Sequence, residues 1–185
     1  MQNRILNLFN RLATGRTIVI LLALFVFFNA VIMPMVGAKI QEYSGGVGPF
    51  DLQFSYTPEQ ALAMLKAYGE QGRPLYALVD LTLDVVYPLV TFLLFGALLT
   101  FLLRRGFPNN ATMQKLALLP LGTILMDYLE NVCVVTMLMT FPNTSTLVAQ
   151  FSSLFTTTKW IFVGLTFVAT LVGLVAWLVR KIQSR

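Results

Sequence analysis

Histidine is absent from this 185-residue chain, and Cys133 is its only cysteine. A single cysteine cannot form a disulfide within the chain, so the sequence says nothing about a redox compartment. Zinc sites built from cysteine and histidine, haem ligation by histidine and catalysis by a Cys–His pair are excluded, because the side chains are missing. Any bound metal would have to be a hard cation held by oxygen atoms. We expect no resident metal and no other cofactor.

Charge is also scarce, since only 11% of the residues are charged and 57% are hydrophobic. Soluble domains carry about 25% charged residues, so the composition indicates a membrane protein. Four segments reach the roughly 20 mostly apolar residues that a helix needs to cross a bilayer, and the last three exceed this length. The chain is predicted to be a single all-α domain over residues 1–185, a four-helix transmembrane bundle. Its helices are expected at about residues 17–36, 76–103, 114–141 and 147–179.

The net charge of +5 does not indicate nucleic-acid binding, because the basic residues lie at the predicted helix ends, where they would meet lipid headgroups. The expected partner is the lipid bilayer. If the chain crosses the membrane four times, the N-terminal segment, the loop between the second and third helices and the C-terminal tail all lie on the same side. These three regions carry nine basic residues and no acid: Arg4, Arg11, Arg16, Arg104, Arg105, Lys115, Arg180, Lys181 and Arg185. Lysine and arginine favour the cytoplasmic side, so both termini are predicted to be cytoplasmic, and the compact chain suggests a bacterial inner membrane.

An alternative for the N-terminus is a cleaved signal peptide, because Val36-Gly37-Ala38 resembles a cleavage site. The preceding apolar run spans about 20 residues, which is longer than the roughly 7–15 residues of a signal peptide core. We therefore favour a first transmembrane helix.

Residues 39–74 form the only sizeable segment expected outside the membrane. Phe50, Leu52, Phe54 and Tyr56 alternate with polar residues, which is typical of a half-buried strand. Thr57-Pro58-Glu59-Gln60 then matches a capping box that starts a short amphipathic helix, and Gly69 is its expected stop. These features predict an extracytoplasmic cap of one strand and one helix. The cap either covers the mouth of the bundle or lies in the headgroup layer.

Ionisable side chains within membrane helices cost several kcal/mol each, so they normally face the bundle interior and have partners. Helical spacing places Tyr76, Asp80 and Asp84 on one face of the second helix, and Asp127, Glu130 and Asn131 on one face of the third. The predicted buried polar cluster contains Asn29, Asp80, Asp84, Asp127, Glu130, Asn131 and Lys159, with Arg73 and Tyr76 as contributors at its outer mouth.

Four carboxylates and one lysine carry a formal charge of −3, which a dry interior cannot hold. The leading hypothesis is a membrane protein that binds a small polar or cationic ligand, or a lipid headgroup, at this cluster. Three alternatives stay open: an enzyme that acts on a lipid by carboxylate acid–base or metal chemistry, a small ion- or proton-coupled transporter, and a purely structural cluster. No catalytic motif such as GxSxG or HExxH is present. Gly164 and Gly173, with Ala169 and Ala176, are a weak signal for a homo-oligomer.

Overall fold

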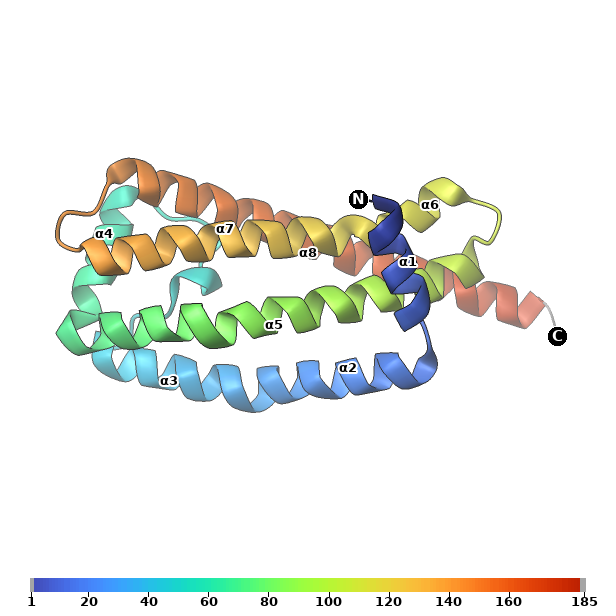
Figure 1. The fold of residues 1–185 in the computed structure, drawn as a ribbon, viewed down its shortest axis with the longest axis horizontal. Helices are drawn as coiled ribbons and strands as arrows, with labels where there is room; N and C mark the ends of the chain where they lie inside the picture. The colour runs from blue at the N-terminus through green and yellow to red at the C-terminus, as the bar shows by residue number, and fades with distance from the viewer. Residues whose placement is uncertain (1, 184–185) are drawn as a thin grey trace.

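The computed structural model describes residues 2–183, which are almost entirely helical. Four helical stretches are long and apolar enough to cross a membrane: Gly15–Ser44, Gly69–Gly106, Ala111–Thr140 and Thr146–Gln183. They run side by side along the long axis of the molecule (Figure 1). The prediction of an all-helical protein with four candidate membrane-spanning helices is confirmed.

The first stretch consists of α2 (Gly15–Phe27), η1 (Phe28–Ile32) and α3 (Met33–Ser44). Thr14 caps α2, because its side chain accepts a hydrogen bond from the backbone N–H of Thr17. The segment η1 is one turn of π-helix that ends just before Pro34. Pro34 has no N–H for the carbonyl of Ala30, so the hydrogen-bonding pattern shifts here. Gly45 ends α3 in the left-handed conformation, with φ of +64°.

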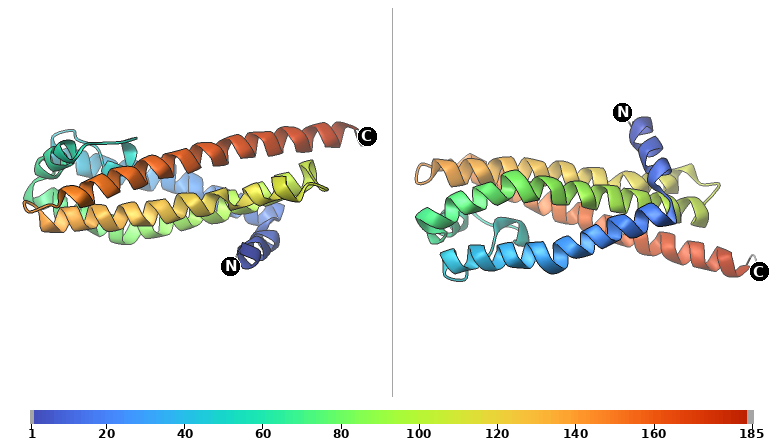
Figure 2. Two further views of the ribbon diagram at one scale, coloured as in Figure 1. Left: turned by 90° about the horizontal axis from the view of Figure 1, so that it is seen from above. Right: turned by 60° about the horizontal axis from the view of Figure 1, so that its bottom comes forward.

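The other three stretches form the centre of the bundle. These are α5 (Gly69–Gly106), α7 (Leu119–Thr140) and α8 (Thr146–Gln183), and α6 (Ala111–Lys115) and η3 (Leu116–Leu118) lead into α7. The helices α5, α7 and α8 pack against one another, whereas α2 and α3 pack mainly on α5 at the edge (Figures 1 and 2). The small residues of α8 serve this packing, since a Cβ on Gly173 would lie 3.1 Å from the Cβ of Leu102.

One helix precedes the four spans. The helix α1 (Gln2–Leu12) lies across the bundle at the end where α6 and the C-terminal part of α8 are found (Figure 2). Its Phe9 is fully buried, with its ring centroid 5.0 Å from that of Phe92. A Cβ on Gly96 would lie 2.2 Å from the Phe9 ring, so only glycine leaves room for this contact. We call this end, which also carries Arg104 and Arg105, the basic end.

The opposite end carries the connection between α3 and α5, residues 45–68, which we call the cap. The cap is shorter than the expected residues 39–74, because α3 continues to Ser44 and α5 already begins at Gly69. It contains η2 (Phe50–Leu52) and α4 (Pro58–Ala67). The helix α4 has the predicted capping box, in which the Thr57 side chain and the Gln60 side chain each bond the other residue's backbone N–H.

The predicted strand of the cap is wrong, because residues 2–183 contain no strand. Phe50 and Tyr56 are buried, but Leu52 and Phe54 are 65% and 61% exposed, so the alternation does not mark one buried face. The extended backbone is bonded to side chains of α8 instead of a second strand. Thr157 Oγ1 donates to the carbonyl of Phe54, and Trp160 Nε1 donates to that of Gln53, both at 3.0 Å. These side-chain donors satisfy the backbone that a sheet would otherwise satisfy.

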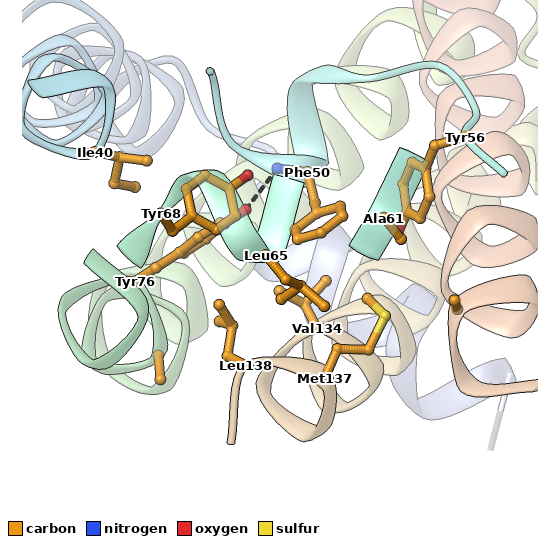
Figure 3. Packing of buried hydrophobic residues seen from close by; sticks show 12 residues of the cluster. Ile40, Phe50, Tyr56, Ala61, Leu65, Tyr68, Tyr76, Val134, Met137 and Leu138 are labelled. Atoms are coloured by element: carbon orange, nitrogen blue, oxygen red, sulfur yellow. Dashed lines mark hydrogen bonds between the residues drawn. The ribbon is translucent and has the colours of Figure 1, made fainter. Parts of the chain in front are cut away.

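An aromatic cluster anchors the cap inside the helices. The rings of Phe50, Tyr56, Tyr68 and Tyr76 contact one another, with Phe50 at the centre (Figure 3). The backbone N–H of Phe50 donates to the Tyr76 hydroxyl at 2.7 Å. The Tyr56 hydroxyl donates to Ser152 Oγ at 2.6 Å, and burial raises its pKa to about 12, so it stays protonated. As a result, η2 reaches inward along the bundle instead of lying over its end (Figure 1).

Candidate functional site

Lys159 forms the centre of the buried polar cluster. Its ammonium lies 3.1 Å from Asp127 Oδ1 and 2.5 Å from Glu130 Oε2, and all three residues are buried. Thr156, one turn earlier on α8, donates from Oγ1 to Glu130 Oε1 at 2.7 Å. Asp127 and Glu130 share a face of α7 because they are three residues apart. Two carboxylates of α7 therefore hold a single ammonium of α8.

The second helical contribution comes from α5, where Tyr76, Asp80 and Asp84 are all buried on one face. Pro88 lacks the N–H that would bond the carbonyl of Asp84, four residues before it. Asn131 Nδ2 on α7 donates to this carbonyl at 3.2 Å. The predicted role of Asn131 as part of the polar cluster thus has a specific form: it replaces a helix hydrogen bond that proline removes.

Asn29 lies at the edge of the cluster, on the π-helical turn η1. Its Nδ2 donates to the carbonyl of Phe25 at 2.8 Å, and its Oδ1 accepts a hydrogen bond from the Tyr87 hydroxyl at 3.2 Å. Asn29 is exposed, and its contact with Tyr87 lies where the first membrane helix borders α5. Tyr87 is the link between this helix and the face of α5 that carries Asp84.

A cavity of about 320 Å³ connects these groups. Its polar lining comes from Asn29, Asp51, Asp84, Asp127 and Lys159, and its other walls are mainly aromatic and aliphatic. The remaining lining residues are Phe25, Leu52, Tyr87, Pro88, Thr91, Phe92, Phe95, Pro120, Thr123, Ile124, Trp160, Val163, Thr166 and Phe167. A pocket with apolar walls and a few convergent polar groups is typical of a small-molecule site.

The predicted cluster therefore divides into two parts. Asn29, Asp84, Asp127 and Lys159 line the cavity, whereas Asp80, Glu130 and Asn131 do not belong to its lining. Glu130 is fully buried and is used by Lys159 and Thr156. Its position is that of a structural partner.

The two residues expected at the outer mouth have other contacts. Arg73 lies over the ring of Phe141, 4.3 Å from its centroid, and donates to the carbonyl of Leu65. Tyr76 is 2% exposed and donates to Asp51 Oδ1 at 3.2 Å. Both residues hold the cap on the helices, and neither belongs to the cavity lining.

Sequence reasoning missed Asp51, which η2 brings from the cap into the cavity. In the sequence it is one of several acids outside the membrane helices, and nothing distinguishes it from Glu42, Glu59 or Glu70. Thr156 could have been found, because it lies three residues before Lys159 and thus on the same helical face.

Two of the residues that line the cavity carry a buried oxygen without a hydrogen-bond partner among residues 2–183. The buried side-chain oxygens without a partner in the described part of the chain include Asp127 Oδ2 and Thr166 Oγ1, and both residues line the cavity. Three carboxylates line the cavity, those of Asp51, Asp84 and Asp127, together with one ammonium, that of Lys159. The site can therefore accept hydrogen bonds from a positively charged group. The acids within residues 2–183 form no group of three or more with the arrangement of a metal site.

Comparison of the chain with models of protein families, with curated proteins and with solved structures found no match.

Proposed function

We propose that this integral membrane protein binds a small ligand through a cationic group, which lies in the cavity between Asp84 and Asp127. The observation that carries the proposal is the unpaired Asp127 Oδ2, which is buried in a cavity that Asp84 and Asp51 also line. The ammonium of Lys159 is already shared between Asp127 Oδ1 and Glu130. A buried carboxylate oxygen without a hydrogen-bond partner costs free energy, so a ligand that brings a cationic donor to Asp127 Oδ2 is stabilised by this contact.

The walls of the cavity support an alkylammonium group in particular. Phe25, Tyr87 and Trp160 line it together with the carboxylates, and aromatic faces attract cations, most strongly where water is excluded. A bare inorganic cation would gain little from such walls. We place the cap on the outer face of a bacterial inner membrane, because the basic residues gather at the other end.

The test is thermal stabilisation of the purified protein by tetramethylammonium chloride, with sodium chloride at equal ionic strength as the reference. Tetramethylammonium should raise the melting temperature of the wild-type protein. Asp84→Asn and Asp127→Asn keep the side-chain shape but remove the charge, so each should lose most of this effect. Glu70→Gln is the matched control, because it removes an exposed acid outside the cavity and should respond like wild type.

Equal stabilisation of wild type, Asp84→Asn and Asp127→Asn would contradict the proposal. So would the absence of any effect of tetramethylammonium on the wild-type protein.

A second candidate role is purely structural, the fixing of α7 against α8, and it applies to a different part of the cluster. Lys159, Glu130 and Thr156 are joined by short contacts between α7 and α8 and are almost completely buried. Such contacts between membrane helices specify packing. The two roles are separable, since variants of Glu130 should change stability and variants of Asp84 should change ligand binding.

A further inference from the structure

We infer that the ligand is a lipid-like amphiphile, with its cationic headgroup at Asp84 and Asp127 and its alkyl chain along the apolar half of the same cavity. This inference rests on the proposed function and names the class of ligand. It follows from the order of polar and apolar residues along the cavity, from where the cavity opens, and from what closes its far end.

The lining changes from polar to apolar along the bundle axis. On α5 it begins at Asp84 near the cap and ends at Phe95, about 16 Å further along the helix. On α8, which runs in the same direction, it begins at Lys159 and ends at Phe167. On the antiparallel α7 it ends toward the basic end at Pro120. Each of these helices therefore presents its ionisable residue at the cap end of the cavity. Beyond it the lining is apolar except for one threonine on each helix, Thr91, Thr123 and Thr166, so a charged end and a mainly apolar end follow each other as in an amphiphile.

The opening of the cavity faces the side of the bundle. The helix α2 packs on α5, and α8 packs on α5 and α7, but α2 and α8 make no extensive contact with each other. Phe25 of α2 and Phe167 of α8 both line the cavity, and Phe167 is 60% exposed. Leu52 of the cap, also exposed, lines it as well. Apolar side chains exposed on a membrane helix face acyl chains, so a ligand chain can pass into the cavity from the bilayer.

Toward the basic end the cavity lining stops at Phe95, Pro120 and Phe167. The helix α1 packs behind this part of the lining, because Phe92 and Ile124 lie in one cluster with the buried Phe9. The space for an alkyl chain is therefore finite. Affinity should rise about fourfold with each methylene that is buried, and the rise should stop when the chain reaches this cluster.

The experiment uses alkyltrimethylammonium compounds of increasing chain length on the full-length protein in nonionic detergent. Val163→Trp fills the apolar half of the cavity and leaves the carboxylates in place. We expect wild-type affinity to increase with chain length, and Val163→Trp to lose this increase while it still responds to tetramethylammonium. Affinities are expressed against the free aqueous concentration of the probe, measured by equilibrium dialysis, because the alkyl chain also partitions into the micelles.

A second measurement does not depend on any variant. Dodecyltrimethylammonium with a diazirine at the chain end is photolysed with the wild-type protein, and the labelled residues are identified by mass spectrometry. We expect labels on lining residues of the apolar half, such as Phe95 and Val163, and competition by the unlabelled compound. The uncharged dodecanol analogue should label these residues much less.

Two outcomes would overturn the inference. One is a chain-end label that falls only on outward-facing residues such as Val168 and Leu171, equally for the charged and the uncharged probe. The other is an affinity that does not change with chain length although tetramethylammonium still stabilises the protein. In that case the proposed site for a cationic group would be supported, and the inference that the ligand is a lipid-like amphiphile would be rejected. Loss of the tetramethylammonium effect itself would instead remove the proposed function.

Discussion

At Lys159 one ammonium is shared by two carboxylates of α7, and the contacts of these side chains predict what its loss would do. Lys159→Met should leave Asp127 and Glu130 buried without their cation and should lower the free energy of unfolding by about 3 kcal/mol. The quantity is measured by reversible unfolding in detergent. The triple variant with Asp127→Asn and Glu130→Gln should recover most of this loss, because the uncompensated charges are gone. A Lys159→Met protein as stable as wild type would show that the ion pairs contribute little.

The contact between Asn131 and the carbonyl of Asp84 exists because Pro88 cannot donate to that carbonyl. Asn131→Leu should leave the carbonyl without a partner and lower the free energy of unfolding by about 1–2 kcal/mol. Pro88→Ala restores the missing N–H, so Asn131→Leu should cost much less in a Pro88→Ala background. Unfolding of the four proteins forms a double-mutant cycle. If Asn131→Leu lowered the free energy of unfolding equally in both backgrounds, Asn131 would not be compensating for the hydrogen bond that Pro88 removes.

Among the elements, α1 packs on the bundle with its Phe9 ring against Gly96 of α5. Gly96→Ala adds a methyl group where the Phe9 ring lies, so Phe9 should be displaced and α1 should detach from α5. Amide hydrogen exchange should become faster in residues 3–12 and stay unchanged in α7 and α8. The matched control is Gly164→Ala, because a Cβ there meets no atom within 4 Å. If α1 kept its protection in Gly96→Ala, its attachment would depend on other contacts, such as Arg104 with Asn10.

The cap shows why local pattern was not enough to predict every element. Its helix α4 was found because a capping box is a local arrangement of four residues. Its strand was wrong because alternation within residues 50–56 does not say what the backbone will bond to. The partners are Ser153, Thr157 and Trp160, about a hundred positions later in the chain. These α8 side chains fix an extended segment against a helix, and a single sequence gives no sign of that pairing.

At the scale of the whole molecule, hydropathy predicted the four long helices, because a bilayer imposes length and apolar character on each span separately. The rule that buried ions need partners predicted that Lys159 would lie in one buried cluster with acids of the third helix, and it contacts both Asp127 and Glu130. The sequence did not predict which acids hold α7 against α8 and which line the cavity. It depends on how α5, α7 and α8 are rotated against one another and on the inward reach of η2, which brings Asp51 to Asp84 and Asp127.

Orientation in the membrane is likewise a property of the whole chain, and it follows from charge. The basic end carries Arg104, Arg105 and Lys115 without an acid, so we expect it in the cytoplasm and the cap outside.

Two single-cysteine variants test this orientation in a Cys133→Ser background. Asn109→Cys places a thiol in the exposed loop between α5 and α6, and Gln60→Cys places one on the exposed surface of the cap. In intact bacterial spheroplasts a membrane-impermeant maleimide should label Gln60→Cys at once and Asn109→Cys only after the membrane is opened. The reverse pattern would put the cap in the cytoplasm, and the amphiphile would then be drawn into the cavity at the level of the inner leaflet, because its headgroup site lies toward the cap.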